Sequence, residues 1–275
     1  IQGEGVSVHR VDLVAQKQAA AVGGHIVQPR YREHGHQLIN ILFAHQLEQI
    51  LWLGAGGKRP GVQQPVPHIF GNRDIAAAEA LVRAGVGSLV LVDNDVVSES
   101  NINRQLIALH STVGQSKAEV TARRCRDISP SAVIHPICAT YDAAHREDFF
   151  SARYDYIADC IDLVTCKLDL IQQAMDRSIP ILSALGTGNK LDPTLLRVTD
   201  ISQTSGCPLA RVMRKELRSR GIRHLKVVFS PEQPAATAQL EAPSPGRRSV
   251  PASVPWVPST AGILLAGAIV RDLIG

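Results

Sequence analysis

Short apolar runs alternate with longer amphipathic stretches from residue 76 onward. The runs are rich in β-branched side chains, which is typical of buried strands. They lie at 89–92, 133–138, 156–160, 180–184, 195–200 and 226–229. Stretches with helical spacing lie between or after them, at 76–84, 117–128, 163–176, 208–220 and 261–273. This alternation predicts an α/β fold, a doubly wound and mostly parallel sheet with a C-terminal strand and helix extension.

Turn residues mark several of the predicted boundaries. Gly85 follows the first helix and suits its C-cap, and Ser259 or Thr260 can cap the last helix. Residues 231–258 contain seven prolines and predict a long surface loop. The apolar part of the last helix, 261–270, is shorter than a membrane span requires, so we expect no membrane partner.

The first 72 residues follow a different pattern. They hold six of the ten histidines, many glutamines and one strongly apolar segment, 38–53, which predicts a helix. Their flanks, rich in glycine and proline, are typical of irregular structure. We therefore expect two parts, an atypical segment at 1–72 and an α/β domain at 73–275. Because the chain begins with Ile1 rather than Met, we also expect the native start to lie elsewhere.

Composition narrows the class of protein only slightly. Hydrophobic residues make up 45% and charged residues 20% of the 275 residues, as in ordinary globular proteins. The net charge of +4 mildly favours an anionic partner. Five scattered cysteines without a C-x-x-C pair argue against a disulfide framework and a structural zinc site. The start shows no secretory signal, and a reducing, cytoplasmic setting fits best.

Two acids follow the strand 89–92 directly. Asp93 and Asp95 therefore stand at the carboxyl end of a predicted parallel strand, where open α/β sheets bind nucleotides. A carboxylate there can accept both hydroxyls of a ribose. The alternative is a simple turn, because Asp-Asn-Asp also favours tight turns and helix caps.

Polar and basic groups come next along the chain. Asn101, Arg104 and Gln105 have helical spacing, which would place Asn101 and Arg104 on one face, and the guanidinium suits phosphate oxygens. Lys117 begins the helix 117–128, where an ammonium beside helix amides also suits phosphate. The alternatives are a solvated helix face and an ordinary surface lysine.

Another acid, Asp162, follows the strand 156–160. A carboxylate near phosphates is a preferred ligand of Mg²⁺. The alternative is that Asp162 caps the helix 163–176. Cys160 and Cys166 flank this acid, and neither is an obvious nucleophile. The turn at 186–189 suits a phosphate or substrate loop, although a plain turn is the more economical interpretation.

The helix 208–220 carries the most basic surface. Its expected apolar stripe contains Leu209, Val212, Met213 and Leu217. The other faces carry Arg211, Arg214, Lys215 and Arg218. Such clusters bind nucleic-acid backbones, and the alternative is an ordinary solvated face. We also expect Cys207, in the turn before this helix, to be exposed.

Three separated segments together resemble the E1-like activating superfamily, which includes the adenylyltransferases of thiamine and molybdopterin synthesis. They are D-x-D-x-V-x-x-S-N-x-x-R-Q at 93–105, V-G-x-x-K at 113–117 and D-x-x-D at 159–162. Further segments resemble the branch of tRNA threonylcarbamoyladenosine dehydratases. They include N-K-L-D-P-T at 189–194, C-P-L-A-R-V-M-R-K-E-L-R at 207–218 and V-F-S-P-E at 228–232. The resemblance covers the chain from about residue 76 to its end.

The resemblance implies a nucleotide site in a Rossmann-like fold. Asp93 would bind the ribose of ATP, with Asp95 and Gln105 beside it. Ser100, Asn101 and Arg104 would contact the phosphates, Lys117 would hold phosphate, and Asp162 would bind Mg²⁺. Arg104, Lys117 and Asp162 are the expected catalytic residues. The implied reaction is an ATP-dependent cyclisation of threonylcarbamoyladenosine in tRNA. The implied partners are tRNA, a second copy of the chain and sulfur-relay proteins.

One departure from the family pattern concerns the glycine loop. The family places G-x-G-G-x-G between the first strand and the following helix, and here that place reads Ile69-Phe70-Gly71-Asn72-Arg73-Asp74-Ile75. Only one glycine remains, and no convincing first strand precedes it. A frameshift, a misplaced start, disorder or true divergence of residues 1–72 would explain this. Two alternative functions stay open, a non-catalytic tRNA-binding relative and an adenylyltransferase for a ubiquitin-like sulfur carrier.

Overall fold

The computed structural model describes residues 67–70, 75–236 and 251–275. The chain divides into two compact units, 1–48 and 49–275, and all the described residues belong to the second. The helix expected at 38–53 and the glycine-loop position at 71–74 therefore lie outside the described residues. The division at residue 72 stays a prediction.

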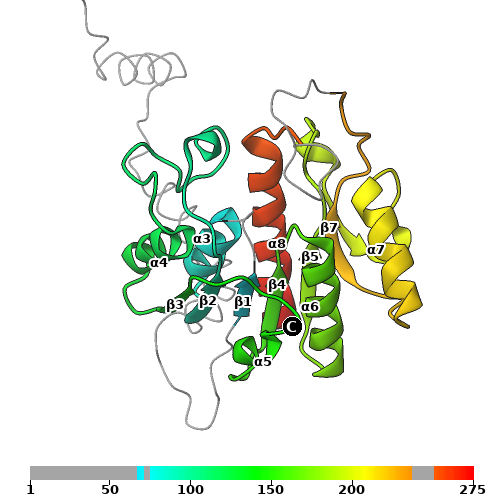
Figure 1. Ribbon diagram of the computed structural model, residues 1–275, viewed down its shortest axis with the longest axis horizontal. Coiled ribbons are helices and arrows are strands. Elements are labelled where there is room, and N and C mark those ends of the chain that lie inside the picture. Colours follow the sequence, from blue (N-terminus) through cyan, green and yellow to red (C-terminus); the bar gives the residue numbers. More distant parts are fainter. Residues whose placement is uncertain (1–66, 71–74, 237–250) are drawn as a thin grey trace, which may run out of the picture. The chain divides into compact units, whose positions relative to one another are not determined.

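A seven-stranded sheet forms the centre of this unit, in the order β3-β2-β1-β4-β5-β7-β6. Its strands are β1 Pro67–Phe70, β2 Ser88–Val92, β3 Val133–Ile137, β4 Tyr156–Asp159, β5 Ile181–Ala184, β6 Arg197–Asp200 and β7 Lys226–Phe229. All neighbouring strands are parallel except β6 and β7, which pair antiparallel. The prediction of a doubly wound, mostly parallel sheet is confirmed (Figure 1).

The sequence pattern did not predict the central strand β1, nor the short helix α5 Arg146–Phe149. Strand β1 pairs with β2 and β4 at once, with His68 opposite both Val90 and Ile157. Proline is tolerated at the first residue of a strand, and pairing on both sides specifies a strand that four residues alone do not. The sheet thus begins before residue 73.

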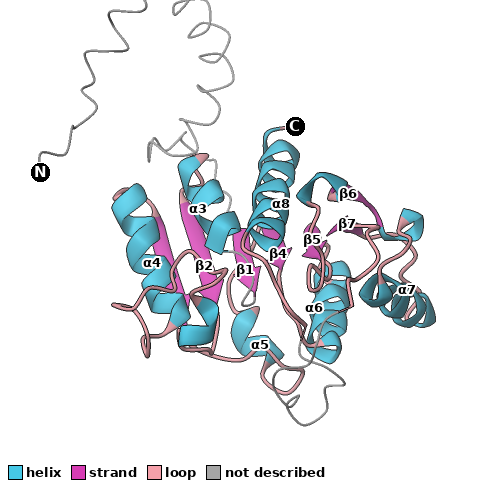
Figure 2. Ribbon diagram, turned by 90° about the horizontal axis from the view of Figure 1, so that it is seen from above, coloured by secondary structure: helices cyan, strands magenta, loops and turns pink. Residues whose placement is uncertain are grey.

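Helices cover both faces of the sheet (Figure 2). One face carries α3 Ile75–Arg83, α4 Lys117–Ile128 and α8 Trp256–Ile274, and the other carries α5 Arg146–Phe149, α6 Val164–Asp176 and α7 Pro208–Ser219. Side chains of a strand alternate between faces. Leu89 and Leu91 of β2 accordingly join the first core, and Val90 and Val92 join the second.

The last helix begins earlier than predicted. It starts at Trp256 after Pro255, so the expected cap at Ser259 or Thr260 is wrong, and Ser259 Oγ instead donates to the Pro255 carbonyl at 2.7 Å. Pro258 misled the prediction. It lies in the first helical turn, where a missing N–H costs no intrahelical bond. The proline-rich loop therefore ends at residue 255 rather than 258.

By length and composition alone, helix α8 is long and apolar enough to cross a membrane. Half of its most apolar 18-residue stretch is buried inside the protein. Leu265, Ala268 and Ile269 are fully buried, in the same core as α3 and the sheet. This burial is typical of a core helix.

Candidate nucleotide-binding site

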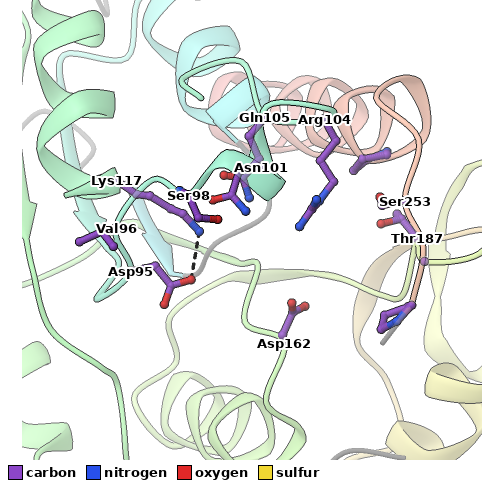
Figure 3. Close-up of a pocket in the computed structure, with 13 residues that line it drawn as sticks. Asp95, Val96, Ser98, Asn101, Arg104, Gln105, Lys117, Asp162, Thr187 and Ser253 are labelled. Carbon is purple, nitrogen blue, oxygen red and sulfur yellow. Dashed lines mark hydrogen bonds and ion pairs between the residues drawn. The ribbon is translucent and has the colours of Figure 1, made fainter. Parts of the chain in front are cut away.

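A pocket of about 310 Å³ opens at the carboxyl ends of β2, β4 and β5 (Figure 3). It lies where the strand order reverses between β1 and β4, which is the usual ligand position in open α/β sheets. Its lining is mainly polar and comes from segments far apart in the sequence. The lining residues are Asp95, Val96, Ser98, Asn101, Arg104, Gln105, Lys117, Asp162, Thr187, Gly188, Pro251, Ser253 and Pro258.

The acidic segment after β2 forms the turn that was considered as the alternative, and its ribose-binding role stays a prediction. Asp93 Oδ1 accepts the N–H of Asp95 at 2.8 Å, so the turn is real. Asp95 lines the pocket, whereas Asp93 is half-buried and is not among the lining residues. Burial raises the pKa of Asp93 to about 6, and the charges of Asp95 and Asp162 act in the same direction, while the Asp95 N–H and Lys117 oppose the rise.

Lys117 is not a surface lysine. It is the first residue of α4, is only 4% exposed, and its Nζ lies 3.0 Å from Asp95 Oδ2. Its backbone N–H also donates to the Asp95 carbonyl at 2.9 Å, and Ser116 caps the helix by accepting from Glu119 N. These contacts fix a buried cation against the acidic turn, pointing into the pocket.

Asn101, Arg104 and Gln105 all line the pocket, but not on the helix face that was predicted. They lie on a short 3-10 turn, Glu99–Asn101, and on the turns that follow it. In these turns the backbone N–H groups of Arg104 and Gln105 both donate to the Asn101 carbonyl. Arg104 Nη1 donates to the Ser100 carbonyl at 2.7 Å and to Asn103 Oδ1 at 2.9 Å. Ser100 itself is exposed and outside the lining.

Asp162 lies across the pocket from Asn101 and Arg104, on the loop after β4. The N-cap of α6 is Leu163, so Asp162 does not cap that helix. Among the described residues no group of three or more His, Cys, Asp or Glu side chains is arranged to hold a metal ion. Mg²⁺ commonly uses only one or two carboxylates together with waters and substrate phosphates. The Asp162 carboxylate lines the pocket and has the chemistry of such a ligand.

Residues 251–255, here called the strap, form one wall of the pocket, and the sequence did not predict it. Asn189 holds it by two bonds to Ala252, at 2.7 and 2.8 Å, and Asn103 Nδ2 donates to the Ser253 carbonyl at 3.2 Å. A Cβ on Gly188 would meet Pro251 Cβ at 2.7 Å, so this glycine permits the close approach. The turn at 186–189 is thus part of the pocket. Residues of the strap and of the turn are about 65 positions apart, and no local pattern could join them.

The basic helix α7 contributes no residue to the pocket lining. Arg211, Lys215 and Arg218 are exposed, whereas Arg214 is half-buried and donates to the Thr204 carbonyl at 2.6 Å. The apolar stripe is shifted from the predicted one, since Ala210, Met213 and Leu217 are buried and Val212 is 45% exposed. Arg214 therefore braces the start of α7.

The cysteines play no visible part in the pocket. Cys207 is 3% exposed, so its expected exposure is wrong, and Cys125, Cys160 and Cys166 are also buried. Cys207 packs into the second core beneath α7. Cys138 is exposed, with its Sγ 3.0 Å from Ser116 Oγ.

These features define a nucleotide-binding α/β protein, in which a lysine, an arginine and carboxylates meet at the switch point of a doubly wound sheet. Residues 75–271 match the model of the ThiF family, and the chain belongs to that family. The match begins at Ile75, just after the position expected for the glycine loop.

Relatives with assigned functions point to one branch. The chain is 39% identical, over 207 residues, to the tRNA threonylcarbamoyladenosine dehydratase of Bacillus subtilis. The matched residues make up 72% of this chain and 82% of that protein. The crystal structure of the Escherichia coli dehydratase in complex with ATP superposes with a TM-score of 0.66 and 30% identity, covering 76% of this chain and 85% of that one. The E. coli molybdopterin-synthase adenylyltransferase is 35% identical over 114 residues, 42% of this chain and 45% of that protein.

Proposed function

We propose that this chain is an ATP-dependent tRNA threonylcarbamoyladenosine dehydratase. The observation that carries the proposal is the convergence of Asn101, Arg104, Lys117 and Asp162 on one pocket at the switch point. The similarity to dehydratases over more than two thirds of the chain supports the substrate class.

Different residues of the site would bind different parts of ATP. Asp93 and Asp95 at the tip of β2 would accept the ribose hydroxyls. Lys117, at the N-terminus of α4, and Arg104 would hold phosphate oxygens, with Asn101, Ser100 and Gln105 positioned nearby. Asp162 would hold Mg²⁺, which when bound offsets negative charge on the triphosphate.

The proposed reaction joins two displacements. The carboxylate of the modified adenosine attacks the α-phosphorus of ATP, the bond to the β-phosphate oxygen breaks, and pyrophosphate leaves. A nitrogen within the same modification then attacks the activated carbonyl carbon, AMP leaves, and the nitrogen loses its proton. The net change in the tRNA is the loss of one water. Arg104 stabilises the charge that develops on the phosphates as pyrophosphate departs.

The surface of α7 supports tRNA as the substrate. Arg211, Lys215 and Arg218 project into solvent from one helix and can meet backbone phosphates. Arg214 is part of the same proposed surface, although its bond to Thr204 leaves less of it available. A homodimer, sulfur-relay partner proteins and a cytoplasmic location belong to the proposal as expectations from the resemblance.

A second candidate, a tRNA-binding relative that has lost catalysis, is favoured by one observation. The sequence Gly71-Asn72-Arg73-Asp74 stands where the family has a glycine-rich loop. Side chains at these positions oppose the close approach of backbone to phosphate.

One experiment separates the two candidates. The chain is incubated with ATP, Mg²⁺ and tRNA that carries threonylcarbamoyladenosine. The dehydratase releases AMP and pyrophosphate and lowers the mass of the nucleoside by one water. A chain that binds this tRNA but neither binds ATP in calorimetry nor releases AMP is the non-catalytic relative, and the proposal is then wrong.

A further inference from the structure

A fully buried ion pair lies behind the loop that carries Asp162. Lys167 Nζ of α6 is 2.8 Å from Asp159 Oδ2 at the end of β4, and both side chains are 0% exposed. Neither residue lines the pocket. The pair therefore does not contact a ligand in the pocket, but it contacts the loop that leads to Asp162.

Both residues of the pair form a hydrogen bond with the backbone of Ile161. Asp159 Oδ1 accepts the Ile161 N–H at 3.0 Å, and Lys167 Nζ donates to the Ile161 carbonyl at 3.1 Å. The carbonyl of Ile161 belongs to the peptide that continues directly into Asp162. The loop is thereby fixed one residue before the carboxylate that points into the pocket.

A third contact ties this arrangement to the next strand. Ser183 Oγ of β5 donates to Asp159 Oδ2 at 2.5 Å. The carboxylate of Asp159 thus receives a hydroxyl, an amide and an ammonium group, which together satisfy a buried negative charge. Ser183 braces Asp159 without touching Ile161.

A buried ion pair is a costly way to fill this space. The desolvation of two charges often exceeds their mutual attraction, and apolar residues of similar volume are commonly as stable. The surroundings are apolar, since Leu168, Leu170 and Ile171 of α6 are buried in the same core. Stability alone gives no reason for a lysine at position 167.

We infer that Lys167 is a positioning residue, which with Asp159 sets the orientation of the Asp162 carboxylate through the Ile161 peptide. The inference rests on the proposed function, because Asp162 is there the residue that meets the metal–triphosphate. Outer partners that orient a metal-binding carboxylate typically contribute 10–100-fold, roughly, in metal affinity or activity.

The test is the neutral pair D159N/K167M, compared with L168A, a packing change at the neighbouring buried residue of α6, as the control. The amide oxygen introduced by D159N still accepts the Ile161 N–H, whereas K167M removes the contact to the Ile161 carbonyl. We expect cooperative melting, an ATP KM within roughly threefold of wild type, and kcat lower by about 10–100-fold. The Mg²⁺ concentration for half-maximal activity should rise by a similar factor. L168A should lower Tm but change neither kcat nor the Mg²⁺ requirement more than about twofold.

Binding provides a readout independent of turnover. Calorimetry of ATP with Mn²⁺ should weaken in D159N/K167M, while ATP binding in EDTA stays unchanged. A triple variant that adds D162N should lose no further Mn²⁺-dependent affinity, because coupled residues are not additive. Should the double variant fail to melt cooperatively, K167R takes its place. It keeps the charge but displaces the Ile161 contact, and the same rise in Mg²⁺ requirement is expected.

Two failures can be told apart. A wild-type chain that releases no AMP contradicts the proposed function, and the Mn²⁺–ATP titrations still compare the variants. An active wild type with a double variant of unchanged kcat, Mg²⁺ requirement and Mn²⁺ affinity overturns the positioning role. Equal losses in L168A would also overturn it, since the pair would then act only through the packing of the core.

Discussion

Replacing Asp93 by Asn should stabilise the protein and weaken its binding of ATP at the same time. Asn is nearly isosteric, and its Oδ1 can still accept the N–H of Asp95, which now bonds to Asp93 Oδ1 at 2.8 Å. The substitution therefore removes a charge and little else. The charge is unfavourable in the free protein, because burial raises the pKa of Asp93 from 3.8 to about 6.

The size of the stabilisation follows from linkage. A carboxyl group whose pKa is higher in the folded state than in the unfolded state binds its proton more tightly when folded. Its contribution to stability is thus fully present below pH 3.8 and is lost as the pH rises through about 6. At pH 7.5 the ionised group costs at most about 3 kcal/mol, which solvent around the partly exposed side chain reduces to roughly 2 kcal/mol.

The assay is unfolding of the wild type and of D93N between pH 4 and pH 8. At pH 7.5 the variant should gain roughly 2 kcal/mol, or about 4–8 °C in Tm. The gain should shrink steadily below pH 6. Its affinity for ATP should fall roughly tenfold, because hydrogen bonds from the ribose to a carboxylate are stronger than those to an amide. D127N, a change of an exposed acid in α4, is the control.

Two results would refute this reasoning. A D93N protein that is less stable at pH 7.5 would mean that the carboxylate is held by favourable contacts which outweigh its burial. A gain that is the same at pH 4.5 and pH 7.5 would mean that it does not come from the ionisation of Asp93. Unchanged ATP affinity alongside the expected pH profile would leave the electrostatics intact and reject the ribose contact.

Four further variants test other parts of the structure. R104A should lower kcat for AMP release by about 10²–10³-fold with little change in Tm, since it removes charge stabilisation from the departing pyrophosphate; an active R104A would reject that role. The triple change of Arg211, Lys215 and Arg218 to Ala should weaken tRNA binding and flatten its salt dependence in filter-binding titrations. A triple variant with wild-type affinity would place the tRNA elsewhere. R214A, by contrast, should lower Tm, because it removes the bond to the Thr204 carbonyl. L265A should destabilise the protein by about 2–5 kcal/mol in chemical unfolding, as expected for a fully buried leucine of a core helix, and a neutral L265A would contradict the packing of α8.

Elements whose sequence signal is local could be predicted closely. The helix expected at 117–128 is found with the same bounds, because Ser116 caps it and an amphipathic pattern fills it. The positive φ of Gly85 agrees with its expected place after α3. The strand β1 escaped prediction because its pairing with β2 and β4 specifies it, and the start of α8 was missed because proline in a first turn looks like a break.

The pocket shows the same division between local and long-range information. Asp95 and Asp162 closely follow the ends of β2 and β4, and ends of parallel strands meet at one edge of a sheet, so their meeting could be predicted. Asn101, Arg104, Gln105 and Lys117 lie farther along the chain, and the family resemblance was needed to place them with these acids. The strap at 251–255 belongs to no strand. It reaches the pocket through Asn103 and Asn189, whose bonds to Ser253 and Ala252 depend on the complete tertiary structure.

The residues of the pocket also share a physical trait that distinguishes them from the core. Burial raises the pKa of Asp93, with smaller contributions from Asp95 and Asp162, and Lys117 is a nearly fully buried cation. Each of these choices costs stability in the free protein, while the helices and strands around them follow their propensities. Lys117 and Asp95 offset one another in part, as their 3.0 Å ion pair shows. The proposed metal–triphosphate would present both signs of charge, and so would offset part of the remaining cost of placing these groups together.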